Sequence, residues 1–174
     1  MNRRKIWLGL ALIALFLTAL GFVRPSDLKP DEVRITVNYD QPLKEMLAEG
    51  NYLYVPPQIL EGKFVLPKDE KGEKTVVMKL FSFGKRMTSK QVKEAMARER
   101  YRPAGLYELG AFDRAFPHLQ EEQEIIALRD SFVDESDQIR VPGAWSRTNP
   151  RNLCLFTDSL DSWDKWDRFL GIRE

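Results

Sequence analysis

Apolar residues fill one long run near the start of the chain and recur at short intervals after it. The run extends from Ile6 to Val23, directly after the basic residues Arg3, Arg4 and Lys5. A basic head followed by an apolar run is typical of a segment that enters a membrane and keeps its basic side in the cytoplasm. A secretory signal holds roughly 7–15 apolar residues and a spanning helix about 17–25, so the run favours an uncleaved anchor but leaves a cleaved signal open.

This pattern predicts the domain organisation of the chain. We expect residues 1–24 to form a signal-anchor or a signal peptide, and residues 25–32 to form a short polar linker. Residues 33–174 then make a single extracytoplasmic α+β domain, since about 100–150 residues is the usual size of one domain. The expected location is the cell membrane, single-pass with the N-terminus in the cytoplasm, or outside the cell if the leader is removed.

Beyond the linker, alternation of apolar and polar residues predicts several strands. Residues 33–38 alternate with the period of a half-buried strand, and residues 75–83 give the strongest strand pattern in the chain. Shorter strands are predicted further on, over residues 125–128, 132–133, 139–141, 153–156 and 169–172.

Helical spacing appears between these strands. A short helix is predicted over residues 42–49, ended by Gly50. A longer one begins at Thr88, which forms a capping-box pattern with Gln91, and another ends at Pro117. Their apolar faces consist of Val92, Ala95 and Met96 in the first, and of Leu106, Leu109, Phe112 and Phe116 in the second.

The order of these elements indicates a fold class. Strands come first, two central helices follow Thr88, and strands return after residue 124. This order favours an α+β domain with small antiparallel sheets over a repeated βαβ unit with a parallel sheet.

Charge argues against one class of partner. The whole chain carries +1, with 27 basic and 26 acidic residues. The first 24 residues hold four basic and no acidic residues, so the remainder has 23 basic against 26 acidic residues, a net −3. A slightly acidic domain without a basic stripe is a poor candidate for binding nucleic acid.

The reactive residues are too few for the common catalytic and metal sites. Cys154 is the only cysteine, so no disulfide forms within the chain, and its alternating surroundings predict a half-buried strand residue. His118 is the only histidine, which excludes a site with two histidine ligands. No Walker loop or dinucleotide fingerprint is present. We therefore predict no enzyme activity, no cofactor and no dedicated metal site.

The segment near the C-terminus is the best candidate for ligand binding. Indole rings flanked by carboxylates suit sugars or peptides, because the ring covers apolar area while its polar neighbours fix orientation. The alternative is that the tryptophans belong to the core. The acidic run could also gather two or three carboxylates around calcium in a loop, although solvated charge is the simpler interpretation. The candidate ligand-binding residues are Trp145, Asp158, Asp161, Trp163, Asp164 and Trp166.

Short motifs throughout residues 33–174 resemble an uncharacterised family of bacterial exported proteins. They include Tyr101-Arg102-Pro103-Ala104, Arg140-Val141-Pro142 and Arg168-Phe169-Leu170-Gly171-Ile172-Arg173. The C-terminal part also resembles the C-type-lectin-like fold of formylglycine-generating-enzyme relatives, a group with variable ligand-binding proteins of diversity-generating retroelements. In this chain, the stretches that match the lectin-like group are Arg102 to Glu108, Gly143-Ala144-Trp145-Ser146 and Phe169 to Arg173.

The resemblance implies a C-type-lectin-like fold whose last stretch forms the binding surface. The enzymes of that group hold copper with paired cysteines, and Cys154 stands alone here, so their catalysis is not carried over. Gly105 also occupies a position where the pattern prefers a Thr helix cap.

Two functions fit these observations. The first is a membrane-anchored or secreted recognition module that binds a protein, peptide or glycan outside the cytoplasm. The second is a structural or assembly subunit of a cell-envelope membrane complex, in which the aromatic surface is buried against other subunits.

Overall fold

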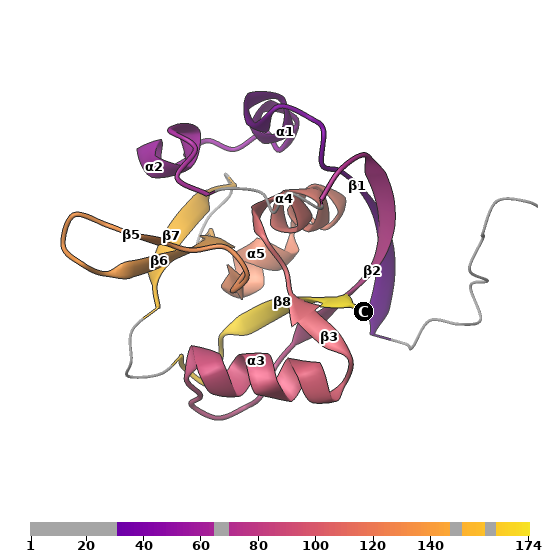
Figure 1. Cartoon of the computed structure of the whole chain (residues 1–174), viewed down its shortest axis with the longest axis vertical. Coiled ribbons are helices and arrows are strands. Elements are labelled where there is room, and N and C mark those ends of the chain that lie inside the picture. The colour runs from indigo at the N-terminus through magenta and orange to yellow at the C-terminus, as the bar shows by residue number, and fades with distance from the viewer. Residues whose placement is uncertain (1–30, 65–69, 147–150, 159–162) are drawn as a thin grey trace, which may run out of the picture.

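The computed structural model describes residues 31–64, 70–146, 151–158 and 163–174. In this part of the chain, eight strands form one sheet that is accompanied by five helices (Figure 1). The strands are β1 (Glu32–Asn38), β2 (Glu73–Phe81), β3 (Tyr101–Pro103), β4 (Ile125–Ile126), β5 (Phe132–Val133), β6 (Ile139–Ala144), β7 (Leu153–Thr157) and β8 (Arg168–Arg173). The helices are α1 (Leu43–Glu49), α2 (Pro57–Leu60), α3 (Ser89–Arg98), α4 (Leu106–Ala115) and α5 (Leu119–Glu122).

The last strand of the chain lies in the middle of the sheet. The order is β1-β2-β8-β4-β6-β5, with β3 also paired to β8 and β7 also paired to β6. Strand β8 pairs with β2 along one edge, and with β4 and then β3 along the other. The described strand pairs are antiparallel except β4 with β8. The α+β class is confirmed, but the expected small sheets form one continuous sheet with a parallel pair.

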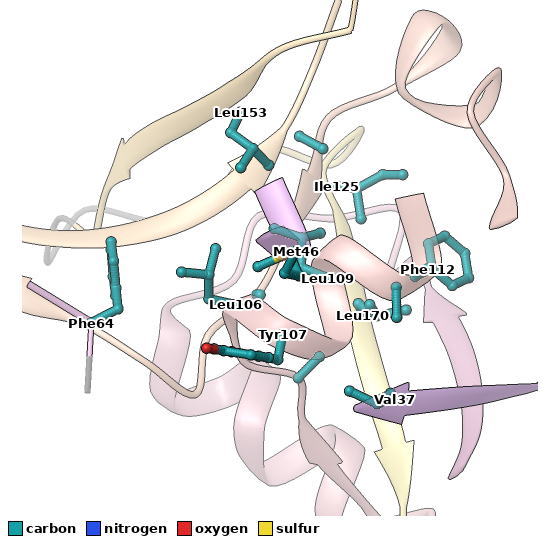
Figure 2. Close-up of a cluster of buried hydrophobic side chains, with 14 of the residues drawn as sticks. Val37, Met46, Phe64, Leu106, Tyr107, Leu109, Phe112, Ile125, Leu153 and Leu170 are labelled. Atoms are coloured by element: carbon teal, nitrogen blue, oxygen red, sulfur yellow. The ribbon is translucent and has the colours of Figure 1, made fainter. Parts of the chain in front are cut away.

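Helix α4 lies between the two wings of the sheet, with β1 and β2 on one side and β5, β6 and β7 on the other (Figure 1). It contacts β1, β6 and α1. Its apolar face forms the larger core cluster, shown in Figure 2, together with side chains from α1 and the strands. Helix α1 packs so closely on α4 that a Cβ at Gly110 would collide with the sulfur of Met46. Burial of these side chains is the main stabilising term for the domain.

Helix α3 covers a second core cluster. The predicted capping box is confirmed, since Gln91 N donates to Thr88 Oγ1 at 3.3 Å and Thr88 N donates to Gln91 Oε1 at 2.9 Å. Further along the helix, the buried Val92 and Met96 belong to one cluster with several aromatic side chains. The aromatic members of this cluster are Phe81, Tyr101, Trp163 and Phe169.

The start of α4 explains the glycine at its cap. Gly105 has no side chain to accept a backbone hydrogen bond, and Asp130 Oδ2 instead accepts from Leu106 N at 2.8 Å. Glu108 Oε2 accepts from Gly105 N at 2.8 Å. A Cβ at position 105 would collide with the Asp130 carboxylate. The family pattern places a capping threonine at position 105, whereas here Asp130 supplies the cap. The carboxylate of Asp130 occupies the space that a Cβ at position 105 would need, which explains the glycine.

Most predicted elements are present with shifted ends. Strand β1 begins at Glu32, inside the expected linker, and β6 continues three residues beyond Val141. The short strand β3 and the one-turn helices α2 and α5 were not predicted. The expected leader, residues 1–24, and most of the linker lie outside the described residues. Among the helices that are described, none is both long and apolar enough to cross a membrane.

Candidate functional site

A cavity of about 450 Å³ opens where the ends of three strands meet. It lies at the start of the parallel strands β4 and β8 and at the end of β6. Two tryptophans and four carboxylates line it, together with one arginine and one glutamine. The lining residues are Glu122, Gln123, Glu124, Trp145, Asp164, Trp166, Asp167 and Arg168.

Backbone hydrogen bonds bring these segments together. Arg168 N donates to the carbonyl oxygen of Glu124 at 3.1 Å, which joins the start of β8 to the residue before β4. Trp145 N donates to Asn152 O at 3.3 Å and so continues the β6–β7 ladder by one residue. Pairing of the strand ends therefore holds Glu124, Trp145 and Arg168, whereas Asp164, Trp166 and Asp167 stand in the turn before β8.

The turn between Asp164 and Asp167 is closed by its own aspartates. Asp164 N donates to Asp167 Oδ2 at 2.7 Å, and Asp167 N donates to Asp164 O at 3.2 Å. Aspartates commonly bond to the backbone of neighbouring residues in turns. Trp166 lies in this turn with 68% of its surface exposed, whereas Trp145, which directly follows β6, is half-buried.

The cavity is electrostatically negative. Four carboxylates line it against the single guanidinium of Arg168. Burial raises the pKa of Asp167, although the hydrogen bonds from Asp164 N and with Glu124 act in the opposite direction. The Asp164 carboxylate raises that pKa further, because two negative charges are held close together.

Three of the predicted site residues meet in this cavity. Trp145, Asp164 and Trp166 all line it, as the recognition hypothesis expects. Asp161 lies outside the described residues.

Trp163 and Asp158, which were also predicted as site residues, are not among the residues that line the cavity. Trp163 is 8% exposed, and its indole Nε1 donates to Ser89 Oγ at 2.7 Å. The Ser89 hydroxyl in turn hydrogen-bonds to the Asp158 carboxylate. The chain of three groups ties the segment around residue 163 to the start of α3, so these two residues support the fold and do not line the cavity.

Five lining residues were absent from the sequence-based set, namely Glu122, Gln123, Glu124, Asp167 and Arg168. Asp167 belonged to the same acidic run as the predicted residues. The run Glu121-Glu122-Gln123-Glu124 before the apolar Ile125-Ile126 is a signal that could have been noticed. Its nearness to the tryptophans depends on the β4–β8 pairing, which no local pattern indicates.

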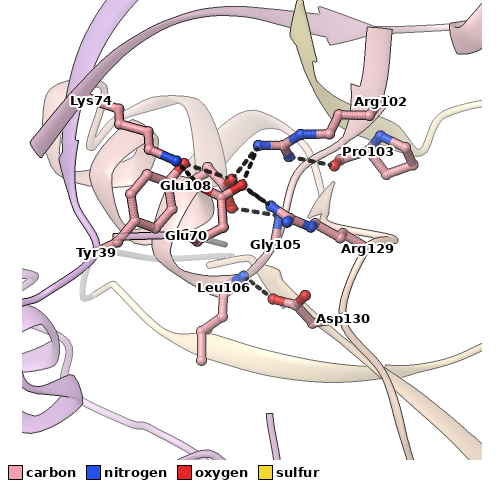
Figure 3. A network of polar contacts seen from close by, with 10 residues as sticks. All are labelled: Tyr39, Glu70, Lys74, Arg102, Pro103, Gly105, Leu106, Glu108, Arg129 and Asp130. Carbon is pink, nitrogen blue, oxygen red and sulfur yellow. Dashed lines mark hydrogen bonds and ion pairs between the residues drawn. The ribbon is translucent and has the colours of Figure 1, made fainter. Parts of the chain in front are cut away.

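A second polar cluster lies at the start of α4, and Figure 3 shows its contacts. The carboxylate of Glu108 is 1% exposed and accepts four hydrogen bonds. Its donors are Tyr39 OH at 2.8 Å, Arg102 Nη2 at 2.9 Å, Arg129 Nη1 at 3.1 Å and Gly105 N at 2.8 Å.

Glu70 joins this network by accepting from the same guanidinium nitrogens of Arg102 and Arg129 as Glu108. It accepts from Arg102 at 3.2 Å, from Arg129 at 2.9 Å and from Lys74 at 3.1 Å. Burial acts to raise the pKa of Glu70, but the hydrogen bonds and positive charges of its partners outweigh it and lower that pKa. A buried ion network whose members are mutually satisfied rigidifies a fold, and we assign this one a structural role.

The only cysteine and the only histidine lie in different segments, Cys154 in β7 and His118 just before α5. Cys154 is half-buried in β7, as predicted; its Sγ lies 3.9 Å from Trp145 O, and burial raises the pKa of its thiol. The exposed His118 faces Glu121, with 3.7 Å between Nδ1 and Oε1. Within the described residues, no three His, Cys, Asp or Glu side chains gather in a way that could hold a metal ion.

Comparison with known proteins gives no relative. No family model, no curated protein and no solved structure matches the chain. The class that the fold defines is a mixed α+β domain, and the resemblances carried by short motifs stay predictions.

Proposed function

We propose that this chain is a recognition module, membrane-anchored or secreted, which binds a protein, peptide or glycan ligand outside the cytoplasm. The observation that carries the proposal is the cavity of about 450 Å³ at the ends of β4, β6 and β8. Its volume falls in the range of small-ligand sites, and it combines an exposed indole with several carboxylates. Such a site fixes orientation by polar groups and gains affinity from the apolar ring.

The proposal includes a C-type-lectin-like fold. Its support is the placement of the C-terminal strand β8 at the centre of the sheet and the contribution of the last stretch of chain to the cavity. The extracytoplasmic location is supported by the basic head and the apolar run from Ile6 to Val23. A proteinase added to intact cells tests that location, because it should digest a C-terminal epitope tag without lysis.

Binding is tested with the full chain in a mild detergent, applied to arrays of peptides and of glycans. We expect a small set of related ligands to be retained, and Trp166→Ala to reduce that retention. Lys93→Ala serves as a matched control, because this exposed residue lies on α3 and not in the cavity. Retention that is unchanged in Trp166→Ala, or absent for the parent protein, contradicts the proposal.

One observation favours the second function, an assembly subunit of an envelope complex. Leu53, Tyr54 and Leu60 expose 73%, 54% and 49% of their surfaces within one short segment around α2. Exposed apolar side chains that cluster often mark a protein interface. Extraction from its native membrane in mild detergent separates the two functions: a monomer favours recognition, whereas recovery only within a larger complex favours assembly.

A further inference from the structure

We propose that the cavity between β4, β6 and β8 receives a protonated amine or guanidinium group, carried by a lysine or arginine side chain of a peptide ligand. The inference rests on the proposed recognition function and specifies its ligand. It is argued from the charge of the lining and from the aromatic ring beside it.

The lining carries a surplus of negative charge. Glu122, Glu124, Asp164 and Asp167 contribute four carboxylates, and Arg168 contributes the one cation among the lining residues. From outside the lining, Arg86 Nη2 lies 3.7 Å from Asp164 Oδ2, so two cations face four carboxylates. The Nη1 group of Arg168 donates to two carbonyl oxygens, that of Trp166 at 2.9 Å and that of Asp167 at 3.4 Å. That nitrogen is therefore directed at the backbone of the turn. A ligand with a positive charge would reduce the repulsion among the carboxylates.

The aromatic wall already accepts a cation in this structure. The ammonium Nζ of Lys165 lies 4.6 Å from the centroid of the Trp166 ring. Attraction between a cation and the face of an indole operates within about 6 Å. A tryptophan ring has two faces, and Trp166 is 68% exposed. An incoming ammonium or guanidinium group would thus meet a ring suited to it and carboxylates within the same cavity.

A neutral sugar fits this lining less well. It would stack on Trp166 but add no positive charge beside the four carboxylates. Burial raises the pKa of Asp167, and the neighbouring Asp164 carboxylate raises it further. Both effects oppose ionisation of Asp167, and a bound cation would oppose them in turn. The charge of the ligand is therefore the property that the cavity selects.

The experiment is a titration of the full chain in mild detergent by calorimetry. The probes are Gly-Lys-Gly and Gly-Arg-Gly, both N-acetylated and C-amidated so that only the side chain carries charge, together with the equally blocked Gly-norleucine-Gly, whose alkyl side chain has no ammonium group. The polyamine spermidine and the neutral sugar chitotriose complete the set. We expect the lysine and arginine peptides to bind about tenfold or more tightly than the norleucine peptide, because only they carry the charge. Affinity should also fall as salt is added.

Three variants locate the site. We expect Trp166→Ala to weaken binding of the lysine peptide about 3- to 30-fold, the range of a cation–π contact. Asp167→Asn should weaken it about threefold to tenfold by removing one carboxylate. Glu94→Gln is the matched control, because this exposed carboxylate on α3 is outside the cavity and should leave affinity unchanged.

The outcomes separate the two proposals. Chitotriose binding that depends on Trp166, without binding of either basic peptide, overturns this inference and keeps the recognition function. Binding of none of the probes, together with empty peptide and glycan arrays, overturns both. Equal affinity for the norleucine and lysine peptides also overturns the inference. Spermidine that binds more tightly than the peptides upholds the amine chemistry and overturns the peptide as its source.

Discussion

The indole nitrogen of Trp163 donates a 2.7 Å hydrogen bond to the hydroxyl of Ser89, the first residue of α3. The same tryptophan exchanges two backbone hydrogen bonds with Met87, at 2.9 Å and 3.4 Å. Its ring also meets Phe169 edge-on, with 5.8 Å between centroids. Trp163 thereby fastens the segment that precedes β8 to the start of α3. Three residues later, Trp166 has 68% of its surface exposed and lines the cavity.

This difference predicts that the two tryptophans contribute unequally to stability. Trp163→Phe removes the hydrogen bond to Ser89 and leaves part of the buried volume empty, so we expect the free energy of unfolding to fall by about 1–3 kcal/mol. Trp166→Phe is the matched control and should change stability by no more than about 0.5 kcal/mol. Urea unfolding of the full chain, followed by circular dichroism at 222 nm, measures both. Equal effects would show that the assignment of the two rings is wrong.

The buried carboxylate of Glu108 should be among the most sensitive positions. Glu108→Gln preserves the shape of the side chain but removes its negative charge. The guanidinium groups of Arg102 and Arg129 then keep Glu70 as their carboxylate partner but lose Glu108. Breaking a buried ion pair from one side costs about 3 kcal/mol or more. Glu121→Gln provides the control, because Glu121 faces the exposed His118. A loss of less than about 1 kcal/mol in the Glu108 variant would contradict a structural role for the network.

Local patterns in the sequence were sufficient for the three longer helices, α1, α3 and α4. The box of Thr88 and Gln91, and the apolar spacing of Val92 and Met96, lie within one helix, so the prediction needed no knowledge of distant contacts. The sheet order was not predictable in this way. Strand β3 is three residues long and ends in Pro103, and its existence depends on pairing with β8, about 70 residues further along the chain.

The candidate site divides along the same line. A cluster of tryptophan and aspartate near the C-terminus predicted Trp145, Asp164 and Trp166, which line one cavity. Composition could not separate Trp163 from Trp166, because the two are three residues apart and equally apolar. The distinction comes from the bridge to Met87, a tertiary contact. Glu124 was missed for the same reason, since the parallel pairing of β4 with β8 brings it to the site.

Gly143 in β6 is expected to resist any side chain. A Cβ there would lie 2.7 Å from the carbonyl oxygen of Ile125 and would collide with the ring of Phe156. Because the carbonyl belongs to the paired strand β4, it cannot move without breaking the ladder, and Gly143→Ala should cost about 1–3 kcal/mol. Gly62→Asn is the control: its φ is +73°, no atom lies within 4 Å, and asparagine tolerates this conformation.

The two glycine variants are compared by thermal unfolding of the full chain. We expect the midpoint to fall in Gly143→Ala and to stay within a few degrees of the parent in Gly62→Asn, since about 1 kcal/mol corresponds to roughly 2–8 °C in domains of this size. A larger fall in the Gly62 variant would mean that backbone strain outweighs packing against β4.

Asp130 should make the free energy of unfolding fall as pH rises, which is the opposite of the usual effect of an aspartate. Burial raises the pKa of Asp130 and the charge of Glu108 adds to this, while the hydrogen bond from Leu106 N and the charges of Arg129 and Arg102 oppose it. A carboxyl group whose pKa is raised by folding favours the folded state in its protonated form. Its contribution is complete below the pKa of the unfolded chain, about 3.9, and is lost as pH rises through the higher folded value.

Asp130→Asn isolates this contribution, because asparagine can still accept the hydrogen bond from Leu106 N but does not ionise. We expect the free energy of unfolding of the variant, relative to the parent, to increase between pH 4 and pH 7. Urea unfolding of both proteins at several pH values measures this difference. A difference that stays constant with pH, or that decreases toward pH 7, would mean that the arginines outweigh burial and that the pKa of Asp130 is not raised.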